Sequence, residues 1–448
     1  MIRSVSFLLL VLLAAGMQSA ATPVSDKLRA ISAVSDVREV AVGPFESCYE
    51  FWFEQPVDHA HPDGATFKQR VLLGHKKQEA PVVVELPGGP IESSDEGELP
   101  GETELSSLLK GNQLIIEHRF FAGSIPENGE IPWEYLTIRQ AAADQHAVIQ
   151  ALKAQLYPAN KWITTGTGQG GQSAIFHRYF YPEDAHVTVP YVAPLNLDRT
   201  DPRIRKFLDR IGSTKISVAA VVFGAEVAWA CKWSVHDFQM LCFEQLDRLL
   251  PLIAEIVQEQ GYTFETVGGL KRAVQLIILE NRFSFWRWGH PCGSIPDPED
   301  DPELIADHLL QVSDPSFFDD KHLAERQPFF YTAFTETGLY DYNVKPFRKF
   351  LPDKENITFA FALPPGAERK PFNKTQMEEI NRWLQTDAEK MLFIYGGLDP
   401  WTATAVDLKQ NGKCQKYLQG GAHHGCRIAT FEGPSKMGIL ETLKEWLQ

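Results

Sequence analysis

The fold of this chain is decided by a short stretch near its middle, Lys161 to Gly171, which has the sequence KWITTGTGQGG. The apolar and β-branched residues at 161–165 predict a buried strand. The glycines that follow predict a sharp turn, and a helix is expected at 170–181. A strand that enters Gly-x-X-x-Gly and continues as a helix is typical of a nucleophile elbow, whose central residue presents its side chain at the end of a strand. Here the central residue is position 168.

Strands and helices alternate on both sides of this stretch. Continuous apolar runs predict buried strands at 81–86, 113–116, 187–192 and 391–395. Two strands with alternating patterns are predicted nearer the N-terminus, at 48–53 and 66–73, and an apolar stripe predicts a helix at 136–157. This order predicts an α/β fold with a mostly parallel sheet and right-handed crossovers.

From Asp198 to Lys370 the strand patterns give way to helical ones. The helices predicted in this region are 203–211, 215–230, 234–260 and 268–285. Strand patterns resume at 391–395, and the chain ends in a predicted helix at 433–447. We therefore predict a core in two parts, 22–197 and 371–448, interrupted by a helical cap at 198–370 that covers the site.

Asp399 and His424, which both follow the predicted cap, complete a pattern of chemical groups. Asp399 follows the strand at 391–395, and His424 lies in a glycine-rich turn further on, with His423 as an alternative. Nucleophile at 168, acid at 399 and histidine at 424 is the chain order of the α/β-hydrolases. The predicted fold is therefore an α/β-hydrolase core with a large helical cap inserted before the acid strand.

Position 168, however, is Gly, which has no oxygen to attack a carbonyl group. Thr167 lacks flanking glycines, and a β-branched residue is a poor occupant of a position with φ > 0. Ser173 falls inside the predicted helix and is expected to face the core. Gly168 accepts the strained turn at little cost, so the elbow is expected to persist without its nucleophile. A serine replaced deliberately, to trap a substrate, would give the same pattern.

The same glycines allow a different interpretation. Gly166, Gly168 and Gly171 fit G-x-G-x-x-G after a strand and before a helix, which is a dinucleotide-binding fingerprint. That fingerprint requires an acidic residue at the end of the next strand, and Asp198 is the nearest one. Several strands precede the motif, whereas the fingerprint usually opens its fold, so a dinucleotide-binding protein is the weaker alternative.

Several other residues have both a functional and a structural interpretation. Glu117, at a strand end, either lines the site or belongs to a buried ion-pair network. Glu280, with Trp286 and Trp288, either faces the cleft or forms the core of the cap. Four possible metal ligands lie near residue 60, but a stretch rich in Asp, Pro and Gly is more typical of a turn. They are Asp58, His59, His61 and Asp63. No metal and no cofactor are expected.

Composition and the N-terminus indicate the setting of the protein. The net charge of −15 argues against nucleic acid as the main partner. Residues 1–21 combine Arg3, the apolar run FLLLVLLAA and small residues at 19–21, which is typical of a secretory signal, with a short membrane anchor as the alternative. We therefore expect a secreted or periplasmic protein that has no membrane contact after signal removal.

The chain has six cysteines, and export would permit disulfides. The sequence alone does not choose a pairing. Cys231–Cys242 and Cys414–Cys426 would close the shortest loops, and buried free thiols are the alternative. No C-x-x-C spacing occurs, so a structural zinc site is not expected.

Many short stretches across the chain resemble one known family, the secreted Streptomyces-type prolyl tripeptidyl aminopeptidases, which are serine peptidases related to lysosomal Pro-X carboxypeptidase. The stretches that carry this resemblance are Phe53–His59, Gly64–Val71, Glu117–Phe121 with Ser124 and Pro126, Trp133, Leu136–Ile138, Gln140–His146, Lys161–Ile163, Tyr395–Trp401 and Gly420–Ile428. The cap region matches poorly.

The resemblance implies roles for particular residues. Asp399 falls on the triad acid of the family and His424 on its base, while Gly168 stands where the family has serine. The backbone N–H of Gln169 would contribute to the oxyanion hole. Family members act on peptides with a free N-terminus, favour cleavage at proline and use acidic residues for the amine, for which Glu117 and Glu280 are weak candidates. We expect an impaired peptidase homologue with a peptide-binding cleft, with an active serine exopeptidase as the alternative.

Overall fold

The computed structural model describes residues 23–40, 43–91, 101–212, 231–367 and 370–448. These residues form one sheet in the order β1-β2-β3-β5-β4-β6-β7-β8-β9. The strands are β1 (Val34–Glu39), β2 (Ser47–Pro56), β3 (Thr66–His75), β4 (Val82–Glu85), β5 (Asn112–Ile116), β6 (Trp162–Thr167), β7 (Val187–Tyr191), β8 (Leu392–Gly396) and β9 (Gln415–Gln419).

The type of strand pairing changes once across the sheet. β1, β2, β3 and β5 pair antiparallel, whereas every pairing from β5 through β4 to β9 is parallel. An antiparallel start, one exchange of neighbours between β4 and β5, and a parallel remainder that carries the elbow after β6 are the arrangement of an α/β-hydrolase. The predicted fold class is confirmed.

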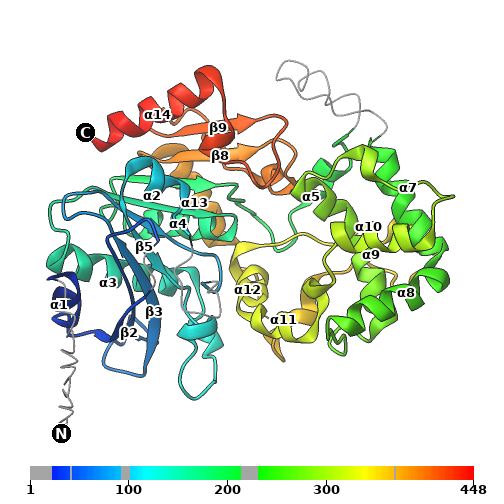
Figure 1. Ribbon diagram of the computed structural model, residues 1–448, viewed down its shortest axis with the longest axis horizontal. Helices are drawn as coiled ribbons and strands as arrows, with labels where there is room; N and C mark the ends of the chain where they lie inside the picture. Colours follow the sequence, from blue (N-terminus) through cyan, green and yellow to red (C-terminus); the bar gives the residue numbers. More distant parts are fainter. Residues whose placement is uncertain (1–22, 41–42, 92–100, 213–230, 368–369) are drawn as a thin grey trace, which may run out of the picture.

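Helices cover both faces of this sheet (Figure 1). The core helices are α1 (Pro23–Arg29), α2 (Glu104–Leu109), α3 (Ile138–Gln155), α4 (Gln169–Phe180), α13 (Lys374–Thr386) and α14 (Gly433–Leu447). Successive side chains of a strand point to opposite faces. Accordingly Val82 and Val84 of β4 pack in the cluster that contains α3, whereas Val83 packs in the cluster that contains α14.

A helical region lies beside the sheet, between β7 and α13, and is here called the cap (Figure 1). Its described helices are α5 (Pro202–Leu208), α7 (Cys231–Glu244), α8 (Leu246–Glu259), α9 (Leu270–Trp288), α10 (Pro302–Val312), α11 (Asp320–Glu325) and α12 (Gln327–Thr332). The predicted helix at 234–260 is in fact two helices, and the one at 215–230 lies outside the described residues. The boundaries at 198 and 370 stay predictions.

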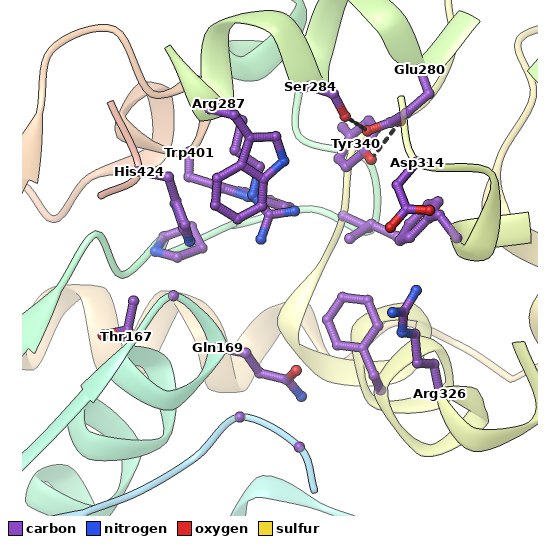
Figure 2. Close-up of a pocket in the computed structure, with 18 of the residues that line it drawn as sticks. Thr167, Gln169, Glu280, Ser284, Arg287, Asp314, Arg326, Tyr340, Trp401 and His424 are labelled. Carbon is purple, nitrogen blue, oxygen red and sulfur yellow. Dashed lines mark hydrogen bonds between the residues drawn. The ribbon is translucent and has the colours of Figure 1, made fainter. Parts of the chain in front are cut away.

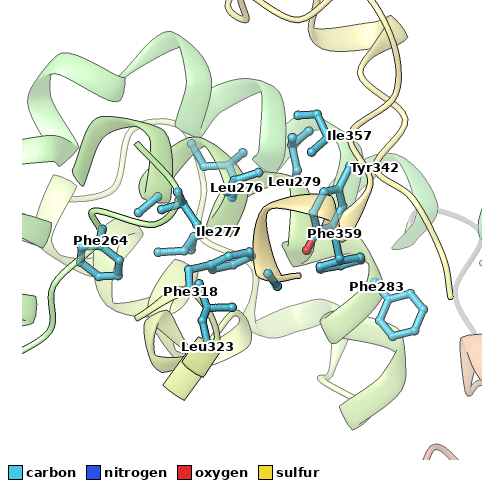
Figure 3. Packing of buried hydrophobic residues seen from close by; sticks show 14 of the residues in the cluster. Phe264, Leu276, Ile277, Leu279, Phe283, Phe318, Leu323, Tyr342, Ile357 and Phe359 are labelled. Atoms are coloured by element: carbon cyan, nitrogen blue, oxygen red, sulfur yellow. The ribbon is translucent and has the colours of Figure 1, made fainter. Parts of the chain in front are cut away.

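The cap has its own large apolar cluster, and this cluster continues into the core. Figure 3 shows Ile277 of α9 close to Phe318 and Leu323, with Phe359 farther along. The same cluster includes Trp401, which follows the acid strand β8. Burying apolar side chains across this boundary stabilises one position of the cap over the sheet.

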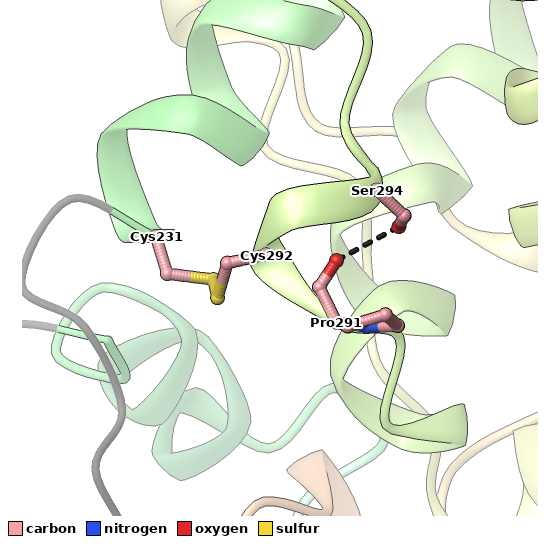
Figure 4. The surroundings of a disulfide bond; sticks show 4 residues. All are labelled: Cys231, Pro291, Cys292 and Ser294. Carbon is pink, nitrogen blue, oxygen red and sulfur yellow. Dashed lines mark hydrogen bonds between the residues drawn. A yellow bond between two sulfur atoms is a disulfide. The ribbon is translucent and has the colours of Figure 1, made fainter.

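One disulfide ties the cap together, between Cys231 at the start of α7 and Cys292 just after α9 (Figure 4). The short-range pairs considered from the sequence are wrong. Cys231 and Cys242 lie on one helix, roughly 16 Å apart along its axis, which no disulfide spans. Cys414 and Cys426 pack in clusters on opposite faces of the sheet. Cys48, Cys242, Cys414 and Cys426 are buried free thiols.

The described part of the chain contains no helix with the length and apolar character needed to span a bilayer. The predicted signal at 1–21 lies outside the described residues.

Candidate active site

The turn after β6 has the geometry of a nucleophile elbow. Gly168 has φ 57° and ψ −113°, and α4 begins at the next residue, Gln169. A Cβ on Gly166 would lie 2.3 Å from the carbonyl carbon of Gly170, so only glycine allows the strand and helix to approach this closely. The N–H of Gly168 donates to the carbonyl of Tyr191 at 2.9 Å, which fixes the turn against β7.

The structure brings Asp399 and His424 together. Asp399 is fully buried after β8, and its Oδ1 accepts a hydrogen bond from the N–H of Trp401 at 3.1 Å. Its Oδ2 lies 2.7 Å from Nδ1 of His424. The carboxylate therefore favours the tautomer with hydrogen on Nδ1, which leaves Nε2 as a free acceptor.

The surroundings of His424 keep the ring neutral. Burial lowers its pKa below the ordinary value of 6.5, an effect that Asp399 opposes and that Arg287 and Arg427 add to. The backbone N–H of His424 donates to the carbonyl of Arg287 at the end of α9 at 2.9 Å. The neighbouring His423 instead packs on Gly289, and its Nδ1 accepts from the N–H of Gly425 at 3.1 Å.

Gly168 and His424 face one another. A Cβ built on Gly168 would lie 3.2 Å from Nε2 of His424 and 3.3 Å from Cε1. A side chain at this position would therefore sit directly against the free nitrogen of the ring. This contact is the geometric relation that a nucleophile and its base require.

A cavity of about 540 Å³ opens above the elbow and beneath α9. Figure 2 shows His424 and Thr167 at one end, and Asp314 and Arg326 at the other. Its walls include several aromatic side chains: Phe121, Trp288, Phe317, Phe329, Tyr340 and Trp401. A largely apolar pocket with a few convergent polar groups is typical of a site for an organic ligand.

The cap contributes a buried carboxylate to this cavity. Glu280 accepts hydrogen bonds from the hydroxyls of Ser284 at 2.7 Å, Tyr340 at 2.8 Å and Tyr342 at 2.7 Å. Burial raises the pKa of Glu280, and these hydroxyls oppose the rise. Of the two tryptophans considered from the sequence, Trp286 is buried, whereas Trp288 is 49% exposed and lines the cavity.

The loop after β4 lies directly on the elbow. A Cβ on Gly88 would lie 2.3 Å from Cβ of Gln169, so this loop needs glycine at the contact. Gln169 opens α4, and an N–H in the first turn of a helix has no carbonyl partner within the helix. Gly88, Gly89 and Gln169 all line the cavity. The sequence contained a signal for this loop, the run Pro87–Pro90 after a buried strand, but it was not assigned to the site.

Comparison with known proteins gives the family. The model of the family PS-10 peptidase S37 matches residues 17–447. The chain belongs to this peptidase family. The chain is also 28% identical, over 400 residues, to prolyl tri/tetrapeptidyl aminopeptidase of Streptomyces mobaraensis, covering 88% of this chain and 79% of that protein. The resemblance drawn from the sequence is confirmed.

Matches among solved structures include two acetyl xylan esterases. The enzyme from a Thermoanaerobacterium species is 9% identical and has a TM-score of 0.38, with 94% of this chain and 90% of that chain covered. The enzyme from a Paenibacillus species is 11% identical and has a TM-score of 0.37, with 95% and 93% covered.

Within this peptidase fold, Glu117 does not line the cavity and belongs to a buried network. Its carboxylate accepts from the hydroxyl of Ser124 at 2.7 Å and from the N–H of Ile91 at 3.0 Å, with Arg70 3.9 Å away. Burial raises the pKa of Glu117, and these donors oppose the rise. The lone pairs of Glu117 thus serve this buried network, and a role of Glu117 in substrate binding stays a prediction.

The residues near the turn at 60 also have structural partners. His61 pairs with Asp58 at 2.6 Å, and His59 pairs with Asp144 at 2.7 Å. Asp144 is also bound by the guanidinium of Arg119, at 2.6 and 2.7 Å. The described residues contain no group of three or more side chains that could hold a metal.

The structure gives little support to the alternative interpretations of the glycine turn, a dinucleotide site and a substitute nucleophile. Asp198, the acid that a dinucleotide site requires, pairs with Lys374 at 2.8 Å instead. Ser173 is buried and accepts from the amide of Gln145 at 2.8 Å, so its hydroxyl belongs to the packing between α3 and α4. Thr167 lines the cavity beside the elbow.

Proposed function

We propose that this chain is a peptide-binding homologue of the aminopeptidases in its family, in which covalent catalysis is lost because Gly168 occupies the position of the nucleophilic serine. The observation that carries this proposal is the 3.2 Å separation between Nε2 of His424 and the position of a Cβ on Gly168. The base is therefore still aimed at the place where a nucleophilic serine would stand, although this chain has no oxygen there.

The remaining parts of a serine-peptidase mechanism support this assignment. A serine at position 168 would pass its proton to His424, whose ring is oriented by Asp399. The backbone N–H of Gln169 and an N–H of the Gly88–Gly89 loop would hold the oxyanion. Without an oxygen at this position no acyl-enzyme forms, and loss of the nucleophile in such a site lowers kcat by a factor on the order of 10⁶.

The ligand that we propose is a short peptide with a free N-terminus. This follows from the named relative, which is a prolyl tri/tetrapeptidyl aminopeptidase. The cavity of about 540 Å³, with aromatic walls and a carboxylate at Glu280, is compatible with a ligand of this size and chemistry. The signal-like residues 1–21 support a secreted or periplasmic location for this binding activity.

The experiment compares the chain with its Gly168→Ser variant. We expect a fluorophosphonate probe to label only the variant, at the introduced hydroxyl, and we expect only the variant to release nitroaniline from Ala-Ala-Pro-nitroanilide. Adding His424→Ala to the variant should abolish both signals. An inert Gly168→Ser variant that is folded by circular dichroism would contradict the assignment of the elbow.

Turnover of the anilide by the unsubstituted chain would support the alternative, an active exopeptidase. Because Thr167 lines the cavity, peptide mapping of any covalent adduct tests whether its hydroxyl has replaced serine. A peptide bound with micromolar affinity by the unsubstituted chain, without cleavage, is the result that we expect.

A further inference from the structure

We propose that the site of this chain hydrolyses activated acyl esters without a covalent intermediate, with His424 activating a water molecule in the cavity beside Gly168. This inference rests on the proposed function, since it uses the same elbow and the same base. It adds a substrate class: short aryl esters or thioesters, whose leaving groups depart more readily than an amine.

The geometry leaves space for a water molecule beside the base. Around the Cβ position of Gly168, apart from its chain neighbours, the atoms within 4 Å in the described residues are Nε2 and Cε1 of His424. A water oxygen cannot take the Cβ position itself, because it must stay at van der Waals distance from Cα of Gly168. The cavity that Gly168 and His424 both line has room for a water molecule beyond this position, at a hydrogen-bond distance of about 2.9 Å from Nε2. A free water molecule would thus take the role of the serine hydroxyl that Gly168 lacks.

The base is prepared to accept a proton. Asp399 holds the hydrogen of His424 on Nδ1, as its Oδ2 lies 2.7 Å away, and so directs the lone pair of Nε2 into the cavity. The charged groups that face the ring are Asp399, Arg287 of α9 and Arg427 of its own loop. Trp288 covers the ring edge-on, with ring centroids 5.6 Å apart. Burial, with the added effect of Arg287 and Arg427, lowers the pKa of the imidazole and keeps it neutral at pH 7, whereas Asp399 opposes this shift.

The reaction balances with water as the co-reactant. The water oxygen forms a bond to the carbonyl carbon while its proton moves to Nε2 of His424, and the backbone N–H of Gln169 stabilises the oxyanion. The bond from the carbonyl carbon to the leaving oxygen or sulfur then breaks. The leaving group departs with the electron pair and takes the proton from His424, which gives a carboxylic acid and an alcohol or thiol.

The test uses p-nitrophenyl acetate and the p-nitrophenyl ester of Ala-Ala-Pro with the full chain. We expect His424→Ala to lower kcat/KM by about 100-fold or more, the usual contribution of a general base. Gly168→Ala should cause a similar loss, because its methyl group, 3.2 Å from Nε2, crowds the water beside the base. No burst of nitrophenol and no mass added to the protein should be seen.

Two control variants keep this result interpretable. His61→Ala removes an 83% exposed side chain and measures the background from surface imidazoles, so its activity should equal that of the parent chain. Gly261→Ala also places a side chain at a residue with positive φ, since Gly261 has φ 75°, at a position with open space around it. It should lose some stability and keep the esterase activity.

Each outcome has a separate meaning. Equal ester hydrolysis by the parent, His424→Ala and Gly168→Ala chains would overturn this inference alone, provided that Gly168→Ser is labelled by the fluorophosphonate. A burst with an adduct on Thr167 would overturn both this inference and the proposed loss of covalent catalysis. An unlabelled and inert Gly168→Ser variant would contradict the proposed function itself. In the expected case, kcat/KM rises with pH and becomes constant above a midpoint lower than 6.5.

Discussion

Two of the places where a buried aspartate pairs with histidine differ in their surroundings, because one faces the cavity above the elbow and the other does not. At the candidate active site Asp399 binds Nδ1 of His424, and Nε2 remains free towards Gly168. In the loop between α4 and β7, Asp184 binds Nδ1 of His146 at 2.8 Å and Nε2 of His177 at 3.0 Å. The geometry of the two aspartates is similar, so a short Asp–His contact does not by itself identify a catalytic pair.

The difference lies in what surrounds the histidines. The ring of His146 stacks on Tyr181, with centroids 4.1 Å apart, and His177 is fully buried. None of these residues lines the cavity. The histidines at Asp184 join α3 and α4 to the chain before β7, whereas His424 meets a ligand space. A free ring nitrogen aimed into a cavity is therefore the property that distinguishes the two regions.

The largest expected effect on kcat comes from disrupting the Asp399–His424 pair, whereas disrupting the histidine contacts of Asp184 should have little effect on kcat. In the Gly168→Ser background we expect Asp399→Asn to lower kcat for the tripeptidyl anilide by about 10⁴-fold, because the wrong tautomer of His424 is then favoured. Asp184→Asn in the same background should leave kcat within about threefold, measured at a temperature where the variant is folded. Equal losses from both substitutions would show that the two aspartates do not differ in function.

Removing the disulfide should affect the cap region more than the Asp184 region. Replacing Cys231 and Cys292 together by serine opens a loop with a sequence separation of 61 residues. In the chain-entropy description this lowers the free energy of unfolding by about 4 kcal/mol. Hydrogen exchange should become faster in α7 and at the end of α9, while α3 and α4 keep their protection; uniform acceleration in all four helices would argue against a locally tied cap.

Asp184 gives a prediction about stability and pH. Burial alone would raise the pKa of Asp184, but hydrogen bonds from His146 and His177 outweigh burial and hold it well below its ordinary value. An aspartate with a lowered pKa stabilises the fold above about pH 4 and loses this contribution as the pH falls further. We expect Asp184→Asn to cost about 3 kcal/mol at pH 7 in urea unfolding, and to cost less at pH 3.

The smallest expected effect concerns Trp288 at the mouth of the cavity. Because its side chain is 49% exposed, Trp288→Ala should change the free energy of unfolding by no more than about 0.5 kcal/mol. The loss of aromatic contact should weaken peptide binding by about 1 kcal/mol, or roughly fivefold in Kd, by calorimetry. Trp286→Ala is the matched control, since it should destabilise the buried cap by about 3 kcal/mol or more.

Local patterns predicted the core and the order of its chemical groups. The strand and glycines of Lys161–Gly171 specify a turn through steric demands that act within a few residues, and Asp399 follows a strand pattern that is equally local. β9 (Gln415–Gln419) was not predicted, because this edge strand is largely exposed and polar. Helix α13 was also missed.

The cap contribution to the site could not be predicted from the sequence. A helical pattern shows which residues are apolar, but it does not show which part of the helix faces a cavity. Trp286 and Trp288 are two positions apart on α9, and one is buried while the other is exposed at the cavity. Asp314 and Arg326 reach the site from cap segments whose placement depends on packing across the cap cluster, which involves residues far apart in the chain.

The hydrogen bond from the backbone N–H of His424 to the carbonyl of Arg287 has a mechanical consequence. The last turn of α9 and the loop that carries the base are joined through this bond. A substitution that displaces the end of α9 would therefore also shift the imidazole, even though it lies outside the elbow and the acid strand.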